Sequence, residues 1–139
     1  MGATPRILIV DDHLAIRRSL RAILDLSSFQ VCGEARSGKE AIEKVVELKP
    51  DIVLLDINMP VMNGVKAAHE IRRISPKTRI VFLTIHDAPA FRDATRLWSH
   101  AFVFKSAAAT ELIPTLNRLA EPLPNPPKRL LKSRRARTD

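Results

Sequence analysis

The residues with the types and spacing to do chemistry are Asp11, Asp12, Asp56, Thr84 and Lys105, each at the end of an apolar run. Three carboxylates brought together repel one another, and one lysine offsets only part of that charge. The remaining oxygen donors favour Mg²⁺, which prefers a few carboxylates, a carbonyl and retained waters. Mg²⁺ and a lysine beside a hydroxyl also stabilise a transferring phosphoryl group. We therefore expect a magnesium-dependent site in which Asp56, the central carboxylate, is the nucleophile.

The apolar runs before these residues predict strands of one parallel sheet. Residues 7–10, 52–55 and 79–83 are almost wholly apolar and lack the alternation of a strand with one solvent face. Such runs are typical of strands that are buried on both faces of a parallel sheet. Shorter candidate strands are residues 30–35 and 101–104. Because the carboxyl ends of parallel strands lie at one edge, this arrangement brings the five polar groups together.

Segments with helical periodicity alternate with these strands. In the second of them, Ala41, Ile42, Val45, Val46 and Leu48 form the expected inward face. Strands that alternate with helices predict an α/β fold with right-handed crossovers. We expect a five-stranded parallel sheet with helices on both faces. The later helices are expected over residues 64–74, from residue 87 onward, and up to about residue 120.

The last predicted helix contains a proline, Pro114. If Thr110 is the N-cap, Pro114 falls in the first turns, where its missing N–H costs no helical hydrogen bond. If the helix begins earlier, a kink is expected at the proline.

The charge pattern predicts one domain followed by a basic tail. The chain has a net charge of +8, but six basic residues and one acidic residue put +5 of it into residues 128–139. Four prolines in residues 122–127 cannot continue a helix and predict an extended linker. We therefore expect a domain over residues 6–120 and a Pro-rich linker with a basic, disordered tail over residues 121–139. Without interleaved aromatic residues, such a tail binds nucleic acid only weakly and non-specifically, if at all.

The chain has one cysteine, Cys32, and no apolar segment of membrane-spanning length. An internal disulfide is therefore excluded, and neither a signal peptide nor membrane insertion is expected. We expect a cytoplasmic protein.

Four blocks, residues 7–13, 54–64, 82–87 and 101–106, resemble the motifs of the receiver domain of two-component response regulators. The resemblance to this CheY-like family covers residues 6 to about 120 and implies a doubly wound, flavodoxin-like α/β fold with strand order 2-1-3-4-5. The segments around His86 and Lys105 are most similar to the NarL/FixJ-type subgroup. Regulators of that subgroup carry a helix-turn-helix output domain, which the segment after residue 120 is too short to form. A stand-alone receiver and a regulator without its output domain both remain open.

The resemblance implies a signalling switch in a phosphorelay rather than an enzyme. Such a domain accepts a phosphoryl group from a sensor histidine kinase or a phosphotransfer protein, and it catalyses only that transfer and its own dephosphorylation. Asp56 would be the phosphoacceptor, and Mg²⁺ would be bound by Asp11, Asp12, Asp56 and the backbone carbonyl of Asn58. The resemblance also implies that the domain can form a homodimer.

Further roles follow from the same resemblance. Thr84 and Lys105 would hold the phosphoryl oxygens, and Phe102 would be the aromatic residue that turns inward on activation. Asn58 and His86 occupy the positions at which the family tunes the lifetime of the phosphoryl group.

Other functions fit the residues less well. A phosphatase with an Asp-x-Asp motif needs a general acid where this chain has Asn58. In a flavodoxin-type cofactor binder, Asp11 and Asp12 would repel the phosphate that the first loop must bind. A non-phosphorylated pseudo-receiver scaffold remains the alternative, although it would typically lack one of the five polar groups. The remaining histidines are expected to be surface residues rather than ligands: His13, His69 and His100.

Overall fold

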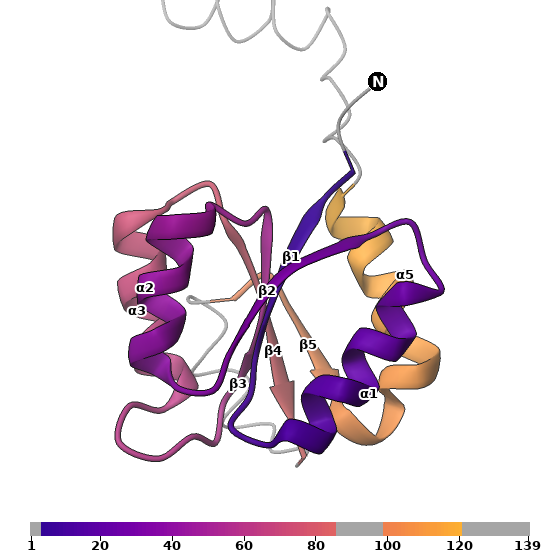
Figure 1. The fold of residues 1–139 in the computed structure, drawn as a ribbon, viewed down its shortest axis with the longest axis horizontal. Helices are drawn as coiled ribbons and strands as arrows, with labels where there is room; N and C mark the ends of the chain where they lie inside the picture. The colour runs from indigo at the N-terminus through magenta and orange to yellow at the C-terminus, as the bar shows by residue number, and fades with distance from the viewer. Residues whose placement is uncertain (1–3, 86–98, 121–139) are drawn as a thin grey trace, which may run out of the picture.

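A computed structural model describes residues 4–85 and 99–120, which form a five-stranded parallel sheet between two layers of helices (Figure 1). The strand order is β2-β1-β3-β4-β5, as predicted. The strands are β1 (Arg6–Val10), β2 (Gln30–Ala35), β3 (Ile52–Asp56), β4 (Arg79–Thr84) and β5 (Ala101–Phe104). The helices are α1 (Leu14–Asp25), α2 (Gly38–Leu48), α3 (Gly64–Ile74) and α5 (Ala108–Ala120), and a 3₁₀ turn, η2 (Lys105–Ala107), precedes α5.

The core lies on both faces of the three central strands. All side chains of β3 are buried, as are those of β1 and β4 after the first residue of each strand. One cluster of buried side chains joins the sheet to α2 and α3, and a second joins it to α1 and α5. Figure 1 shows these two pairs of helices on opposite faces of the sheet. The continuous apolar runs thus form strands that water reaches on neither face.

Side chains fix the start of two helices near the carboxyl edge of the sheet. The hydroxyl of Ser37 accepts a hydrogen bond from the N–H of Glu40 at 3.1 Å and caps α2. The side-chain carbonyl of Asn63 accepts one from the N–H of Lys66 at 2.9 Å and caps α3. Each cap satisfies a backbone donor that the helix itself leaves unpaired. The loops after β2 and β3 are thereby held in place beside the polar edge.

One detail of the helices differs from expectation, and a second decides between two alternatives that the sequence left open. Val46 is 62% exposed, because the buried stripe of α2 runs through Ala41 and Val45 and leaves Val46 about 100° further round the helix. Helix α5 begins at Ala108, so Thr110 is not its N-cap and Pro114 lies inside the helix. The missing N–H of Pro114 leaves the carbonyl of Thr110 without its usual helical partner.

Several predictions concern segments outside the described residues. These are the fourth helix from residue 87, the side chain of His86, and the linker and tail over residues 121–139. Among the residues that the structure does describe, no helix has both the length and the apolar character needed to cross a membrane.

Candidate functional site

The sheet register brings the predicted polar residues to one edge. Strands β1 and β3 end side by side, so that Asp11 comes level with Asp56. Strand β4 ends at Thr84, next to the end of β3. Lys105 follows the last residue of β5, which pairs with Thr84. Groups that are up to about a hundred residues apart in sequence therefore converge because all the strands are parallel.

Lys105 lies between two buried carboxylates. Its Nζ is 2.7 Å from Oδ2 of Asp11 and 3.2 Å from Oδ1 of Asp56. Asp11 and Asp56 are both fully buried, whereas the side chain of Asp12 is 26% exposed. Burial and the charge of Asp11 raise the pKa of Asp56 to about 6, although Lys105 acts in the opposite direction. Burial lowers the pKa of Lys105, but its contacts with the two carboxylates raise that pKa overall.

The two oxygens of Asp56 have different surroundings. Oδ1 accepts a hydrogen bond from the backbone N–H of Asn58 at 3.1 Å and faces Lys105. Oδ2 is buried and has no hydrogen-bond partner among the described residues. A buried acceptor without a partner is costly, so an oxygen of this kind is suited to an incoming cation or reactant.

The other predicted site residues occupy three different environments. Thr84 is buried at the end of β4 and only 4% exposed. Phe102 is half-buried on β5, and its ring centroid lies 5.6 Å from that of Phe82 with the planes tilted by 53°. Asn58 is exposed in the loop after β3. The structure therefore brings Thr84 and Lys105 to the carboxylate cluster, and His86 lies outside the described residues.

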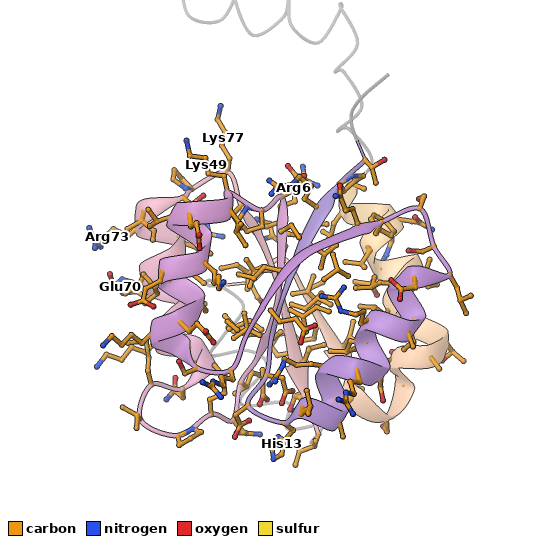
Figure 2. The ribbon with its side chains drawn as sticks, in the orientation of Figure 1. Arg6, His13, Lys49, Glu70, Arg73 and Lys77 are labelled. Carbon is orange, nitrogen blue, oxygen red and sulfur yellow. The ribbon has the colours of Figure 1, made fainter. Side chains whose placement is uncertain are left out.

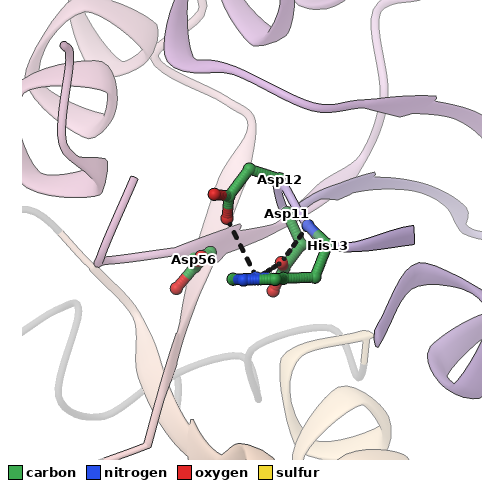
Figure 3. Close-up of side chains that lie close together, drawn as sticks. All are labelled: Asp11, Asp12, His13 and Asp56. Carbon is green, nitrogen blue, oxygen red and sulfur yellow. Dashed lines mark hydrogen bonds and ion pairs between the residues drawn. The ribbon is translucent and has the colours of Figure 1, made fainter. Parts of the chain in front are cut away.

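His13 is closer to the site than expected of a surface histidine. Its side chain is 65% exposed, yet Nδ1 lies 3.2 Å from Oδ1 of Asp11 and 3.2 Å from Oδ1 of Asp12 (Figure 3). Ligand atoms of these three residues and of Asp56 all lie within 4.8 Å of one another. The direct succession Asp11-Asp12-His13 was the sequence signal for this contact.

The other two histidines are exposed. His69 lies on α3. His100 precedes β5, and its Nδ1 accepts a hydrogen bond from the N–H of Ile80 at 3.0 Å, so this ring stabilises the sheet edge far from the carboxylates.

Arg17 supports the site from α1. It donates one hydrogen bond to the backbone carbonyl of Asp11 at 2.6 Å and another to Oε1 of Glu34 at 2.9 Å. Arg21 donates to the second oxygen of Glu34 at 2.8 Å. Partial burial raises the pKa of Glu34, but the two arginines lower it overall. The guanidinium of Arg17 thereby ties the end of β1 to α1 and β2, a contact that sequence reasoning did not anticipate.

Replacing Arg17 with methionine is expected to lower the free energy of unfolding by about 2 kcal/mol, because the Asp11 carbonyl loses its donor and Glu34 loses a partly buried partner. Arg18→Met is the matched control, since the neighbouring Arg18 is exposed on the same helix. Urea denaturation of both variants measures the difference. Equal stability of the two variants would contradict a structural role for Arg17.

Comparison with known families gives a match over almost the whole described domain. The family model for the response regulator receiver domain matches residues 7–117. The chain is 38% identical to the chemotaxis protein CheY of Thermotoga maritima over 117 residues, which cover 84% of this chain and 98% of that protein. It is 36% identical to the response regulator GacA of Pseudomonas viridiflava over 112 residues, which cover 78% of this chain and 51% of that protein. The chain thus spans nearly all of one relative and about half of the other.

Solved structures show the same architecture. The signal receiver domain of a NarL response regulator from Mycobacterium tuberculosis matches with a TM-score of 0.80 and 31% identity, over 86% of this chain and 98% of that one. The response regulator domain of Thermotoga maritima CheB matches with a TM-score of 0.75 and 30% identity, over 86% of this chain and 100% of that one. The similarity includes the strands whose ends form the polar edge.

Proposed function

The chain belongs to the response regulator receiver domain family, and we propose that it accepts a phosphoryl group on Asp56 from the phosphohistidine of a sensor kinase or a phosphotransfer protein. Receiver domains are signalling switches rather than enzymes in the usual sense. The assignment rests on the surroundings of the Asp56 carboxylate. This group is buried, its pKa is raised, and only one of its two oxygens has a hydrogen-bond partner among the described residues. The Asp56 carboxylate is therefore the proposed nucleophile.

We propose that the polar edge binds Mg²⁺ through the carboxylates of Asp11, Asp12 and Asp56 and the backbone carbonyl of Asn58. These residues fit a hard divalent cation, because the donors are oxygens and Lys105 contacts only two of the three carboxylates. The unpaired Oδ2 of Asp56 adds to the fit, since a cation would satisfy the buried acceptor. Mg²⁺ bound here would offset the negative charge of the transferring phosphoryl group.

In the proposed transfer, a carboxylate oxygen of Asp56 forms a bond to phosphorus. The bond from phosphorus to the donor histidine nitrogen breaks, and its electron pair stays on that imidazole. Lys105, already within reach of Asp56, and the hydroxyl of Thr84 would hold the phosphoryl oxygens. Both groups stabilise charge at the atoms where it accumulates during transfer.

The proposed signal leaves the site through Thr84 and Phe102. If Thr84 moves toward the phosphoryl group, the half-buried ring of Phe102 turns inward from its tilted contact with Phe82. The phosphoryl group shifts this equilibrium only through contacts that differ between the two states. Asn58 and His86 are the proposed positions that tune how long the phosphoryl group persists.

The remaining assignments extend the same proposal. Residues 6–120 form the receiver domain, and residues 121–139 form a linker and a basic tail with weak, non-specific affinity for nucleic acid. A histidine kinase or phosphotransfer protein is the partner in the cytoplasm, and a homodimer is the assembly to look for in solution.

The proposal predicts that a small phosphodonor such as acetyl phosphate adds one phosphoryl mass to the intact protein in the presence of Mg²⁺. A chelator should abolish most of this gain, because the charge at the carboxylate cluster then opposes the donor. Intact-protein mass spectrometry measures both conditions. A protein that gains no phosphoryl mass from any small donor, while remaining folded, would favour the pseudo-receiver scaffold instead.

A further inference from the structure

The imidazole of His13 shares the carboxylate site. Figure 3 shows the ring between Asp11 and Asp12, with dashed contacts to both carboxylates. Both contacts from Nδ1 are 3.2 Å long. The outer part of the ring is open to solvent, since 65% of the side chain is exposed. In Figure 2 His13 lies at the opposite end of the molecule from Arg6, Lys49 and Lys77, at the carboxyl edge of the sheet.

Hydrogen bonds hold the main chain of His13 on both sides. The N–H of His13 donates a hydrogen bond to Oδ1 of Asp11 at 2.9 Å. The carbonyl of His13 accepts one from the N–H of Arg17 at 3.1 Å, in the first turn of α1. His13 is the N-cap residue of α1, but its side chain makes no capping hydrogen bond. The main chain of His13 is therefore fixed, while its ring makes no hydrogen bond that caps the helix.

A second observation indicates that the site is built for a cation. Oδ2 of Asp56 is fully buried and has no hydrogen-bond partner among the described residues. In an octahedral site with bonds of about 2.1 Å, neighbouring donors lie about 3 Å apart and opposite donors about 4.2 Å apart. The candidate ligand atoms of Asp11, Asp12, His13 and Asp56 lie within 4.8 Å of one another. A small contraction brings four donors, one of them nitrogen, around one ion.

We propose that His13 adds an imidazole ligand to this site and shifts its preference toward first-row transition cations such as Mn²⁺, Co²⁺ and Ni²⁺. Mg²⁺ binds almost only oxygen donors, whereas imidazole nitrogen suits the later divalent metals. The inference rests on the metal site proposed above and adds to it the choice of metal.

In the opposite role, His13 would not bind the cation but would compete with it for the carboxylates, because its ring would merely occupy the space between them. The two roles predict opposite signs: removing a ligand weakens binding of Co²⁺, whereas removing a competitor strengthens binding of every divalent cation. The ratio of Co²⁺ to Mg²⁺ affinity separates the two.

Calorimetric titration of the tag-free full chain with Co²⁺ and with Mg²⁺ tests the proposal, using His13→Ala and the control His69→Ala, whose histidine is exposed on α3. We expect His13→Ala to lower the ratio of Co²⁺ to Mg²⁺ affinity at least about tenfold, since residues that only orient ligands already cost that much. His69→Ala should leave the ratio as in the wild type. An unchanged ratio, or tighter binding of both metals in His13→Ala, would overturn the assignment.

Spectroscopy provides a readout that a purely structural role would not change. With bound Mn²⁺, the nitrogen of a directly coordinated imidazole modulates the electron spin echo. This modulation should be present in the wild type and in His69→Ala and absent in His13→Ala. Mg²⁺ binding without nitrogen coordination of Mn²⁺ would overturn the role of His13 alone. A wild-type protein that binds none of these metals would overturn the proposed metal site itself.

Discussion

Replacing Asp56 with asparagine is expected to stabilise the metal-free protein at neutral pH by up to about 3 kcal/mol. Burial and the charge of Asp11 raise the pKa of the Asp56 carboxyl from 3.8 to about 6. Each pKa unit corresponds to about 1.4 kcal/mol of difference between the two protonation states. An asparagine has nearly the same shape but no charge, so the substitution removes the cost of the buried anion and, with it, the proposed nucleophile.

The pH dependence of this gain has a defined sign. Because the pKa of Asp56 is higher in the folded protein, folding favours its protonated form. That contribution is fully present below about pH 4 and is lost as the pH rises through about 6. The stability difference between Asp56→Asn and the wild type should therefore be small at low pH and reach its full value near pH 7.

Thermal unfolding in chelator across this pH range measures the difference. Asp25→Asn is the control, because Asp25 is an exposed carboxylate at the end of α1, outside the cluster. A gain for Asp56→Asn that shrinks as the pH rises would contradict the burial of a destabilising charge at this position.

The second large effect is expected at Gly64, where α3 starts against the end of β3. The N–H of Gly64 donates a hydrogen bond to the carbonyl of Ile57 at 2.8 Å. A methyl group on Gly64 would lie 2.7 Å from Cα of Ile57, 2.9 Å from the carbonyl carbon of Asp56, and closer still to its oxygen. These are backbone atoms next to a paired strand, so they cannot rotate away. Gly64→Ala should cost about 3 kcal/mol of stability and displace Asp56, which would also slow phosphorylation.

Gly33→Ala is the matched control for this substitution. A methyl group there would also be too close to a neighbour, at 2.6 Å, but that neighbour is the flexible end of the Leu48 side chain. Rotation of Leu48 relieves the contact, so a smaller loss is expected. Urea denaturation measures the stability of both variants. Equal losses of stability would show that the close approach of α3 to the backbone of β3 does not exclude a side chain at Gly64.

The apolar runs of the sequence were sufficient to predict the sheet. Residues 52–55 are all apolar, without the alternation of apolar and polar residues that a strand with one solvent face shows. This pattern indicates a strand that is buried on both faces, as in a parallel sheet with helices on both sides. The strand order, which the resemblance to the receiver family implied, is confirmed. Because the chemistry lies at the strand ends, the same reasoning placed Asp11, Asp56 and Lys105 together before any distance was known.

Contacts that depend on side-chain direction could not be predicted in this way. The bond from Arg17 to the carbonyl of Asp11 depends on how α1 leaves the sheet, and its pairing with Glu34 joins residues on separate elements. The exposure of Val46 depends on how wide a stripe of α2 the sheet covers. The positive φ of 68° at Val61, unusual for a β-branched residue, belongs to the turn between β3 and α3 rather than to any local preference.

The early start of α5 has a similar origin. The 3₁₀ turn over Lys105–Ala107 continues directly into α5, and the helix begins at Ala108, two residues before Thr110. That hydroxyl instead donates a hydrogen bond to the carbonyl of Ala107 at 3.2 Å. Lys105, the first residue of this turn, contacts the two buried carboxylates.

The most direct test of the central proposal locates the phosphoryl group on the chain. After incubation with acetyl phosphate and Mg²⁺, borohydride reduces an aspartyl phosphate to homoserine, which peptide mass spectrometry identifies by position. Homoserine at residue 56, and its absence when Mg²⁺ is withheld, is the predicted result. Homoserine at Asp11, at Asp12 or at any other carboxylate, with residue 56 unchanged, would contradict the assignment of Asp56 as the phosphoacceptor.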